Sequence, residues 1–428
     1  MLSGKMFFAN RSGPCEGRIL ALICCAAVAG CLFLATVACT DRRKGNTNDF
    51  ASGGIATLSA VKAPILQEPS TSPEIYEPLA AIGTCSPDGW RLQRQSSKYG
   101  GASDLDMLEG IWGSSPHDVF VVGTKIRIGG IILHFDGATW MEMDRPMKTE
   151  LYGIWGASSS DIYAVGDSVL HYDGARWSVS AEMGEAGLKS VWGDSKVDVF
   201  AVGAPNLIYH FDGEKWTSAE GGKQEGFFRS APGVWRRDAP EMLAGFSAVW
   251  GASPSSIFAT GHLTRSASPV SIVLHYDGAK WAPIRDERFV QMAGGVWGTS
   301  GSDVFVVGDG IEHFDGSSWH VMRTETDAEF MWPFFEGRRG GYVGRARLTA
   351  VWGTSSSDVF AVGDARAMFR PKGSLILHYD GDEPWREMSA GTRTELRGIW
   401  GSGPTDVFAV GAFGTILHYE GESCLPLR

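Results

Sequence analysis

A phrase of fourteen residues recurs seven times in this chain, and that repetition limits the possible folds more than any other feature. The first copy is GIWGSSPHDVFVVG, from Gly110, and the last is GIWGSGPTDVFAVG, from Gly398. A repeat of roughly 40–50 residues is one supersecondary unit that buries its apolar residues against its neighbours, so the copies predict a series of packed units. The tryptophans that mark the copies are Trp112, Trp155, Trp192, Trp250, Trp297, Trp352 and Trp400.

Each copy contains four short apolar runs, which predict four β-strands. The first run ends in Trp-Gly, the second has the form DVFAVG, the third has the form LHYDG, and the fourth starts at a second tryptophan. Gly, Ser and Asp residues after the first run predict a turn, and Asp-Gly after the third predicts a hairpin. Four antiparallel strands per unit are typical of a propeller blade. We therefore expect an all-β fold, a seven-bladed β-propeller with four-stranded antiparallel blades.

The two ends of the repeated region complement each other. The seventh copy stops after its third run and has Cys424 where the other copies have their second tryptophan. The segment CSPDGWRL, which begins at Cys85, has the turn and the fourth run of a blade but no earlier runs. We expect this N-terminal segment to complete the last blade.

Cysteine usage agrees with this closure. Five of the seven cysteines lie within the first 39 residues, which leaves Cys85 and Cys424 in the repeated region. Two such cysteines in an exported chain favour a disulfide between them. The alternative is a pair of free thiols that lie near the two ends.

The first 39 residues have the order of a secretory signal. Lys5, Arg11 and Arg18 precede the apolar run ILALICCAAVAGCLFLATVAC, which ends at Cys39. The ending TVAC is similar to the cleavage box of bacterial lipoproteins, although Thr36 stands where that family usually has leucine, and the resemblance implies lipidation of Cys39. An uncleaved signal anchor is the alternative, because the run is nearly long enough to span a bilayer.

Composition separates a tether from the folded body. Residues 40–84 are rich in Ser, Thr, Pro, Gly and charged residues, so they bury too little surface to offset the entropy of ordering them. We expect residues 1–39 to be the signal, 40–84 a flexible tether and 85–428 the propeller. The propeller would be a monomer held by a lipid anchor in the bacterial cell envelope, on the periplasmic side or at the surface. The net charge of −11 argues against a nucleic-acid partner.

Several motifs resemble known repeat families. The order DVFAVG, HYDG and a later Trp is similar to the kelch repeat, although the double glycine of kelch repeats is absent. The DGxxW turn is similar to the Asp-box of sialidase-type propellers but is one residue shorter. From Cys85 to Cys424, the chain more closely resembles the WG/DVFAVG/HYDG-repeat lipoproteins of myxobacteria and their relatives. This resemblance implies a propeller fold and export but little about function.

Seven of the ten histidines occupy one repeated position. A ring of metal ligands is one interpretation, and geometry opposes it. Ligands must lie about 2 Å from a zinc ion, whereas the third strand of a blade lies two strand spacings of about 4.8 Å from the innermost strand. We therefore expect half-buried imidazoles that bond to the adjacent turn. They are His134, His171, His210, His275, His313, His378 and His418.

An aspartate precedes the second run in six copies, and Ser256 takes its place in the fourth. We interpret it as a turn residue whose carboxylate accepts backbone N–H groups. A Ser–His–Asp triad could be drawn in almost every copy, and that multiplicity argues against it, because a nucleophile needs one polarised constellation. The sequence therefore predicts no catalytic residue, no cofactor and no metal. The aspartates are Asp118, Asp161, Asp198, Asp303, Asp358 and Asp406.

The repeated tryptophans are expected to pack between blades, because such rings bury large apolar areas. Aromatic platforms for sugars are the alternative. In either case the repeated phrase holds the fold together, and function should depend on the positions where the copies differ.

The copies differ mainly in long insertions, which all fall on one face of the expected ring. In an up-and-down blade, the loops after the first and third strands share one face. The loops after the second strand and between blades share the other, and every insertion belongs to this second set. Variable loops on one face of a repeat protein commonly form its binding surface. The insertions cover residues 217–246 and 320–348 between blades, and 124–130, 262–271 and 364–374 after second strands.

Aromatic residues and arginines are concentrated in these insertions. Both are enriched at binding hot spots, and arginine pairs with carboxylates and phosphates. We therefore predict a surface for an extracytoplasmic protein or an acidic glycan. The alternative is that the loops fold over the face and bury their own rings. The predicted binding residues are Trp332, Phe334, Arg338, Arg339, Tyr342, Trp235, Arg236, Arg366 and Arg370.

Polar residues follow the second strand at this loop-rich end. Asp167, Asp309 and Asp364 come after AVG or VVG endings, and His262 has the corresponding place in the fourth copy. We expect them at the mouth of the central channel. A calcium site or a pair of catalytic carboxylates is one interpretation. Salt bridges to the insertion arginines are the favoured one.

These observations favour a non-enzymatic binding or scaffold module. One alternative is a hydrolase or lyase that acts on a polysaccharide with carboxylates near the channel mouth. Another is a structural protein with both faces sealed. An enzyme should have close carboxylates with shifted pKa values in a cleft near the axis, whereas a binder should present a broad patch of aromatic and arginine side chains.

Overall fold

The computed structural model describes residues 82–95, 106–183, 187–205, 207–218, 242–264, 269–284, 293–322, 324, 346–367 and 370–424. All of them belong to one compact unit, Tyr76–Arg428, and the other unit, Met1–Ile75, lies outside the described residues. No helix in these described ranges has the length and apolar character needed to cross a membrane.

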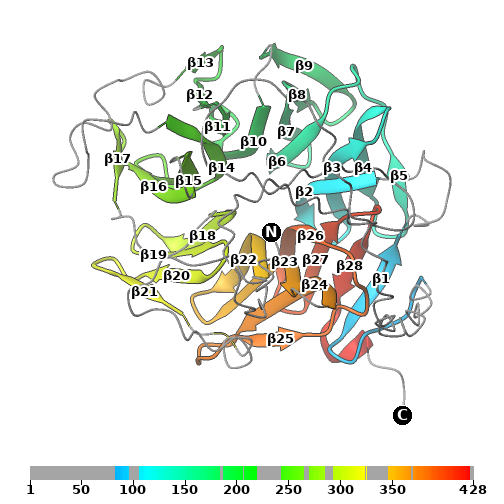
Figure 1. Ribbon diagram of the computed structural model, residues 1–428. Helices are drawn as coiled ribbons and strands as arrows, with labels where there is room; N and C mark the ends of the chain where they lie inside the picture. The colour runs from blue at the N-terminus through cyan, green and yellow to red at the C-terminus, as the bar shows by residue number, and fades with distance from the viewer. Residues whose placement is uncertain are drawn as a thin grey trace, which may run out of the picture. The chain divides into compact units, whose positions relative to one another are not determined.

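The described strands form seven four-stranded antiparallel sheets, which follow one another around a ring (Figure 1). This arrangement confirms the predicted seven-bladed β-propeller. Blades 1 to 3 contain β2 (Asp106–Ser115), β3 (Asp118–Lys125), β4 (Gly129–Phe135) and β5 (Trp140–Glu142); β6 (Leu151–Ser158), β7 (Asp161–Gly166), β8 (Ser168–Tyr172) and β9 (Trp177–Glu182); and β10 (Gly187–Ser195), β11 (Asp198–Ala204), β12 (Leu207–Phe211) and β13 (Trp216–Ser218). Blades 4 to 6 contain β14 (Met242–Ser253), β15 (Ser256–Thr264), β16 (Pro269–Tyr276) and β17 (Trp281–Pro283); β18 (Gly295–Ser300), β19 (Asp303–Val307), β20 (Ile311–Phe314) and β21 (Trp319–Val321); and β22 (Ala346–Ser355), β23 (Asp358–Ala367), β24 (Arg370–Tyr379) and β25 (Arg386–Met388).

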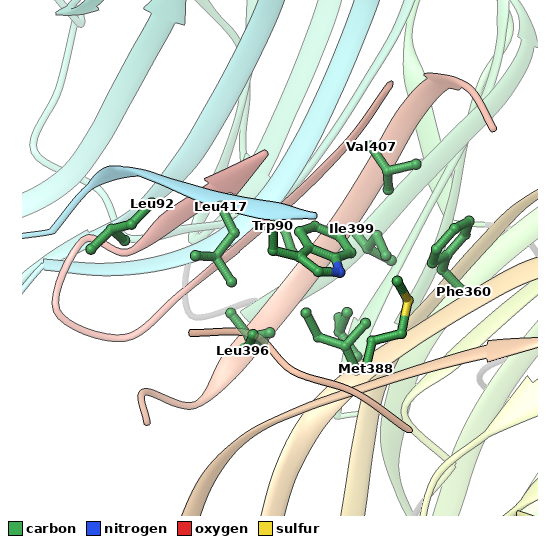
Figure 2. Packing of buried hydrophobic residues seen from close by; sticks show 12 residues of the cluster. Trp90, Leu92, Phe360, Met388, Leu396, Ile399, Val407 and Leu417 are labelled. Carbon is green, nitrogen blue, oxygen red and sulfur yellow. The ribbon is translucent and has the colours of Figure 1, made fainter. Parts of the chain in front are cut away.

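The seventh blade combines strands from both ends of the described chain, as the sequence predicts. Its strands, in spatial order, are β26 (Leu396–Gly403), β27 (Asp406–Gly411), β28 (Ile416–Tyr419) and β1 (Trp90–Arg94). β1 runs antiparallel to β28, with Trp90 opposite Tyr419 and Leu92 opposite Leu417. Figure 2 shows Trp90 and Leu92 near Leu417, in a cluster that also contains Phe360 of blade 6. The N-terminal segment therefore supplies the outer strand that closes the ring.

A disulfide also joins the two ends. Cys85 bonds to Cys424, which ends the 3-10 turn η2 (Gly421–Cys424). The two Cα atoms lie 5.7 Å apart although the residues are 339 positions apart in the chain. The predicted pairing is confirmed.

The second strand of each blade contributes to two cores. In β3, Val119 and Val121 belong to a cluster shared with blade 7, whereas Phe120 and Val122 belong to a cluster shared with blade 2. Because alternate side chains of a strand point to opposite faces, a strand buried on both faces needs a continuous apolar run. The repeated DVFAVG motif meets this requirement.

The tryptophan of each repeated phrase packs against the glycine of the same phrase in the next blade. A methyl group on that glycine would lie only 2.5 to 3.0 Å from ring carbons of the tryptophan, so a larger residue would push the blades apart. We call each such contact a Trp–Gly joint. The joints are Trp112–Gly156, Trp155–Gly193, Trp192–Gly251, Trp250–Gly298, Trp297–Gly353, Trp352–Gly401 and Trp400–Gly113. They run around the whole ring and agree with the packing role predicted for these tryptophans.

Three of the sequence insertions extend strands. β15 and β16 pair out to Thr264 and Pro269, and β23 and β24 pair out to Ala367 and Arg370. In blade 1, β3 and β4 pair as far as Lys125 and Gly129. These hairpins project from the end of the ring that carries the interblade insertions, because the second strand ends there and the third begins there.

Candidate functional site

Each repeated histidine is bonded within its own blade. In six blades Nε2 of the histidine lies 2.5 to 2.9 Å from Oδ1 of the repeated aspartate. An ionised carboxylate only accepts hydrogen bonds, so Nε2 is the donor. Each imidazole also packs against an aromatic ring of the second strand, with centroids 4.0 to 4.7 Å apart. The prediction of half-buried imidazoles bonded to the adjacent turn is confirmed.

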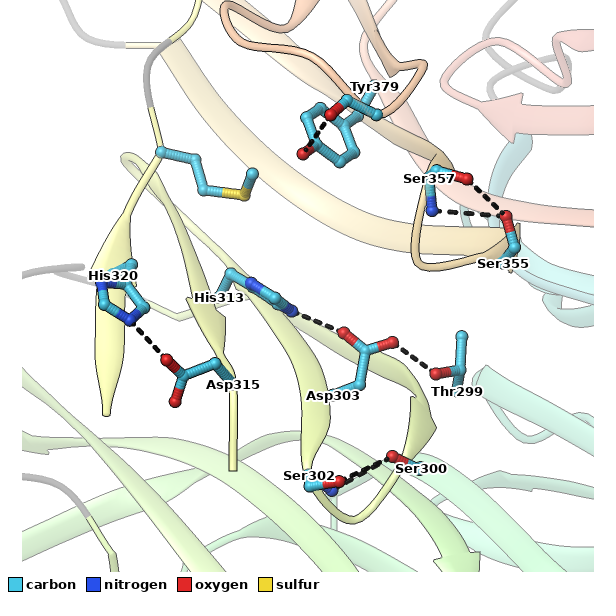
Figure 3. A network of polar contacts seen from close by, with 12 residues as sticks. Thr299, Ser300, Ser302, Asp303, His313, Asp315, His320, Ser355, Ser357 and Tyr379 are labelled. Atoms are coloured by element: carbon cyan, nitrogen blue, oxygen red, sulfur yellow. Dashed lines mark hydrogen bonds and ion pairs between the residues drawn. The ribbon is translucent and has the colours of Figure 1, made fainter. Parts of the chain in front are cut away.

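The repeated aspartate has other partners than the sequence predicts. In blade 5, the Thr299 hydroxyl and the His313 imidazole both donate to the Asp303 carboxylate, as Figure 3 shows. The backbone N–H of Ser302 donates instead to Ser300 Oγ, at 3.2 Å. The predicted role of this aspartate as an acceptor for backbone N–H groups was therefore wrong. The imidazole takes one carboxylate oxygen in all six blades, and a hydroxyl takes the other in four of them.

The aspartate of the Asp-Gly turn is the residue that accepts backbone N–H groups. Oδ1 of Asp136 accepts from Ala138 at 2.9 Å and from Thr139 at 2.8 Å. These hydrogen bonds hold the pKa of Asp136 below its ordinary value. Backbone hydrogen bonds lower the pKa of the equivalent carboxyls in other blades in the same way, at Asp173, Asp212, Asp277 and Asp315.

Blade 4 departs from this pattern. Ser256 Oγ lies 3.2 Å from Nε2 of His275, and no carboxylate takes the place of the serine. Burial lowers the pKa of His275, and the charge of Asp277 opposes that change. Within the described ranges, no three His, Cys, Asp or Glu side chains are grouped to hold a metal ion. The repeated polar residues thus form contacts within single blades.

The innermost strands of the seven blades enclose a cavity of about 470 Å³. Part of its wall is an apolar ring, formed by the residue before each repeated tryptophan and 6–8% exposed. This apolar ring consists of Ile111, Ile154, Val191, Val249, Val296, Val351 and Ile399. From there the cavity extends to Ala204 and His262, which lie toward the loop-rich ends of β11 and β15.

A second ring faces the same cavity, three residues before each tryptophan. Its seven members are all different, and we call it the variable ring: Glu109, Tyr152, Lys189, Ser247, Gly294, Thr349 and Arg397. The charged and aromatic members come from the consecutive blades 7, 1, 2 and 3, and we call them the charged wall. The members from blades 4, 5 and 6 are small. The cavity is therefore polarised from one side to the other.

Arg397 of the charged wall lies between two carboxylates, Glu109 of the same wall and the neighbouring Glu395. Its Nε lies 3.0 Å from Oε1 of Glu395, and its Nη1 lies 3.7 Å from Oε2 of Glu109. Burial raises the pKa of Glu109, while the charges of Arg397 and Lys189 oppose the rise. Glu109 is therefore a carboxylate that has lost part of its hydration and depends on nearby cations.

Tyr152 provides an aromatic platform in this wall. The Lys189 ammonium lies 3.2 Å from the centroid of the Tyr152 ring, in a cation–π contact. The Tyr152 hydroxyl donates to Glu150, and burial together with this hydrogen bond raises the pKa of the phenol. Burial lowers the pKa of Lys189, and the carboxylates of Glu109, Glu150 and Asp167 oppose that change.

Of the four predicted channel-mouth residues, His262 is the one that lines this cavity. Burial together with the charge of Arg347 lowers the pKa of its imidazole. Asp167 follows β7 and acts electrostatically on two members of the charged wall. Asp364 lies opposite Arg347 in the pairing of β22 with β23, and Asp309 lies between β19 and β20.

Seven of the nine predicted binding residues lie outside the described residues. They are Trp332, Phe334, Arg338, Arg339, Tyr342, Trp235 and Arg236, and the predicted lipidation site Cys39 also lies outside. For Arg366 and Arg370 the structure describes the backbone, in β23 and β24.

Sequence reasoning missed the charged wall. Glu109, Tyr152, Lys189 and Arg397 stand immediately before the repeated phrase, after a Leu and ahead of its first two residues. The sequence offered one signal, a contrast within the repeat. The residues on either side of this position are similar from copy to copy, whereas the residue at the position differs in all seven copies.

A wider depression of about 760 Å³ lies at the seam between β1 and blade 1. Its polar groups bond to one another. Arg91 donates to both oxygens of Glu420, at 3.0 and 2.8 Å, and Gln93 contacts Trp140 Nε1 and His418 Nδ1 at 2.9 and 3.0 Å. This network stabilises the closing seam and leaves the axial cavity as the candidate site.

The closed ring of seven four-stranded blades places the protein in the class of β-propellers, and solved structures share this fold. YCF48 bound to a D1 peptide is 14% identical with a TM-score of 0.52, over 80% of this chain and 100% of that one. YCF48 from Cyanidioschyzon merolae is 14% identical with a TM-score of 0.54, over 78% and 98%. The WD40 propeller domain of Doa1 is 10% identical with a TM-score of 0.51, over 79% and 100%. No protein-family model and no curated protein matches the chain.

Proposed function

We propose that this protein is a non-enzymatic binding module, which receives a segment of a partner protein at the loop-rich end of its central channel. The observation that carries the proposal is the contrast within the innermost strands. The packing residues recur seven times, whereas the residues of the variable ring are all different and include partly buried charges. Burying charge costs free energy, so a channel that only closed the ring would be expected to carry small neutral residues.

The comparisons support a protein partner over a glycan. One similar propeller is YCF48 bound to a D1 peptide, so a related architecture accepts a protein segment. The aromatic and arginine residues of the insertions, with Trp332 and Arg338 among them, would widen the contact surface around the channel mouth.

The proposal places the module outside the cytoplasm. Residues 1–39 would direct export, lipidated Cys39 would anchor the chain in the bacterial envelope, and residues 40–84 would be the tether. Support comes from the TVAC ending and from the resemblance to myxobacterial repeat lipoproteins and, more distantly, to kelch repeats.

An enzyme that acts on polysaccharides is the second candidate, and Glu109 is the observation that favours it. Its raised pKa is a property that a general acid needs. Against this, Glu395 forms an ion pair with Arg397 and Glu150 accepts a hydrogen bond from the Tyr152 hydroxyl, so the carboxylates next to the wall are engaged by its members. The binding function is therefore preferred.

Crosslinking in intact envelopes, followed by mass spectrometry, tests the proposal. The wild-type chain should capture a defined extracytoplasmic protein, and Trp332→Ala with Arg338→Ala should reduce that capture about tenfold or more, as hot-spot residues do. Arg176→Ala is the matched control, because Arg176 is 83% exposed beside an Asp-Gly turn on the opposite face. Equal capture by the double variant would refute the proposed surface. Binding on a glycan array, or release of reducing sugar that is lost in Glu109→Gln, would favour the alternatives.

A further inference from the structure

The lining of the axial cavity carries more positive than negative charge. Among the described residues that line it, Lys189, Arg347 and Arg397 are the cations and Glu109 is the one carboxylate. With a neutral His262, the lining has a formal charge of +2. The whole chain has the opposite sign, with a net charge of −11. A cavity lined by one sign of charge raises the local concentration of groups of the other sign, so this cavity favours an anion.

The cations of the charged wall already have partners within the chain. Arg397 lies between Glu395 and Glu109, at 3.0 and 3.7 Å. The Lys189 ammonium lies on the Tyr152 ring, and the charge of Glu109 acts on it as well. The charges of this wall are therefore largely balanced before any ligand enters.

Arg347 differs from these two cations. It comes from β22, near the wall of small residues, and its side chain is exposed. In the part of the chain that the structure describes, no ion pair joins Arg347 to a carboxylate, although Asp364 is the opposite residue in the ladder of β22 and β23. A guanidinium offers a planar fork of N–H donors that matches a carboxylate in two parallel hydrogen bonds. Arg347 is therefore the cation of the lining that is available to an incoming anion.

The surroundings of Arg347 leave room for such a group. Burial and the charge of Arg347 lower the pKa of His262, so this neighbour is a neutral imidazole that can exchange a hydrogen bond with the ligand. Ser247 and Gly294 have small side chains, and the volume of about 470 Å³ is within the usual range for ligand sites. The apolar ring, with Val296 among its members, can contact the methylene groups of a stem.

We propose that the axial cavity binds a carboxylate of the partner protein at Arg347, with the stem of that group between the small residues and the apolar ring. This inference rests on the proposed function and deepens it, because it names the chemical group that the partner segment brings into the channel. An acidic side chain and a free C-terminal end both supply a carboxylate, and the experiment distinguishes them.

Calorimetric titration of the purified full chain tests the inference with three peptides. The first is Gly-Leu-Glu-Leu-Gly with both ends blocked, the second has glutamine in place of glutamate, and the third is the glutamine peptide with a free C-terminal carboxylate. The blocked glutamate peptide, the free-end peptide or both should bind at least about tenfold more tightly than the blocked glutamine peptide, since a hydrogen bond to a charged group is worth that much. The tighter of the two identifies the source as a side chain or a chain end. Trigalacturonate that binds more tightly than every peptide would overturn the assignment to a protein.

Two variants should shift the affinity for the tighter carboxylate peptide in opposite directions. Arg347→Gln should weaken binding about tenfold or more, because a neutral amide replaces the guanidinium. Glu109→Gln should strengthen binding several-fold, because it removes the carboxylate of the lining and with it a repulsion. Arg176→Gln and Glu214→Gln are the matched controls in Asp-Gly turns of the opposite face, and they should leave the affinity unchanged.

The His262 ring reports where the carboxylate binds. A carboxylate at Arg347 offsets the charge that helps to lower the pKa of His262, so NMR titration should find this pKa raised when the peptide is bound. Arg347→Gln should raise it without any peptide. His275, which lies outside the cavity lining, is the internal control and should not respond. An unchanged His262 pKa at saturating peptide would overturn the placement of the ligand.

The gain in Glu109→Gln separates binding from stability, because a loss of structure can only weaken binding. Equal affinity for all three peptides, or weaker binding by Glu109→Gln, would overturn the inference. So would the absence of binding in both the wild type and Glu109→Gln. If the envelope crosslinks persist and still require Trp332 and Arg338, such a failure concerns the channel alone and the proposed binding function stands.

Discussion

Two rings of side chains lie on the same seven strands, three residues apart, and they follow opposite rules. The Trp–Gly joints are identical in every blade, whereas the variable ring has seven different residue types. A joint is a contact between neighbouring blades, so each blade must present the same two surfaces. The variable ring faces a cavity, where no neighbouring blade constrains the side chain.

The comparison distinguishes residues that pack the blades together from residues that are available to contact a ligand. Packing accounts for the recurrence of Trp-Gly in the phrase. Each tryptophan ring lies so close to the glycine of the next blade that a larger residue there would clash with it. Packing does not account for charges on one side of the cavity, because partly buried charges are costly. The comparison therefore predicts that substitutions in the joints change stability and that substitutions in the variable ring change binding.

The largest expected effect tests the joints. Trp352→Ala should lower the free energy of unfolding by about 3 kcal/mol, near the lower end for tryptophan truncations in cores because the ring is partly exposed. Urea denaturation followed by intrinsic fluorescence measures the loss. Gly401→Ala should weaken the same joint from its other side, because the added methyl would lie 2.6 Å from the Trp352 ring.

Ser247→Ala is the control for this comparison. It alters the variable ring without removing a joint, so the free energy of unfolding should change by less than about 0.5 kcal/mol. A loss for Ser247→Ala as large as that for Trp352→Ala would break the distinction between the two rings.

The next largest effect is expected where blade 7 closes the ring. There the outer strand β1 is held to β28 by strand pairing, whereas in the other blades a turn of the chain also joins the third strand to the fourth. Cys85→Ser with Cys424→Ser should lower stability by about 2–4 kcal/mol, because the disulfide restricts the unfolded chain over a long loop. Urea unfolding of the double variant, with reduced wild type as a second preparation, measures the loss. Peptide mapping without reductant should find the two cysteines linked in wild type. Equal stability of oxidised and reduced protein would show that β1 closes the ring without help.

The repeat also decides how much can be predicted from sequence. The blades, the closing strand and the disulfide follow from local patterns, since each strand and turn recurs and Cys85 and Cys424 are the cysteines at its ends. The channel site was only partly predicted, through His262 and Asp167. Glu109, Lys189 and Arg397 meet only after the ring closes, and which side of the innermost strand faces the axis depends on packing between blades. The partners of the repeated aspartate were also missed, because the imidazole and, in four blades, a hydroxyl compete with the backbone for the same oxygens.

The smallest expected effect compares blade 4 with the other six. Burial lowers the pKa of His275, so the folded protein binds this proton less readily than the unfolded chain does. The stability contributed by neutral His275 is therefore present above the unfolded pKa of about 6.5 and is lost as the pH falls through the lowered pKa.

Ser256→Asp would supply the carboxylate found in the other blades and should raise the pKa of His275. At about pH 5.5 the variant should be more stable than wild type by about 0.5–1 kcal/mol, an estimate reduced for partial exposure of the pair. NMR titration of the His275 ring and urea midpoints at two pH values measure both changes. Ser255→Asp, in the same turn but outside the histidine contact, should move neither quantity. An unchanged His275 pKa in Ser256→Asp would contradict the assignment of the blade 4 difference to the missing carboxylate, because blades 2 and 3 form the aspartate–histidine pair without a serine or threonine four residues earlier.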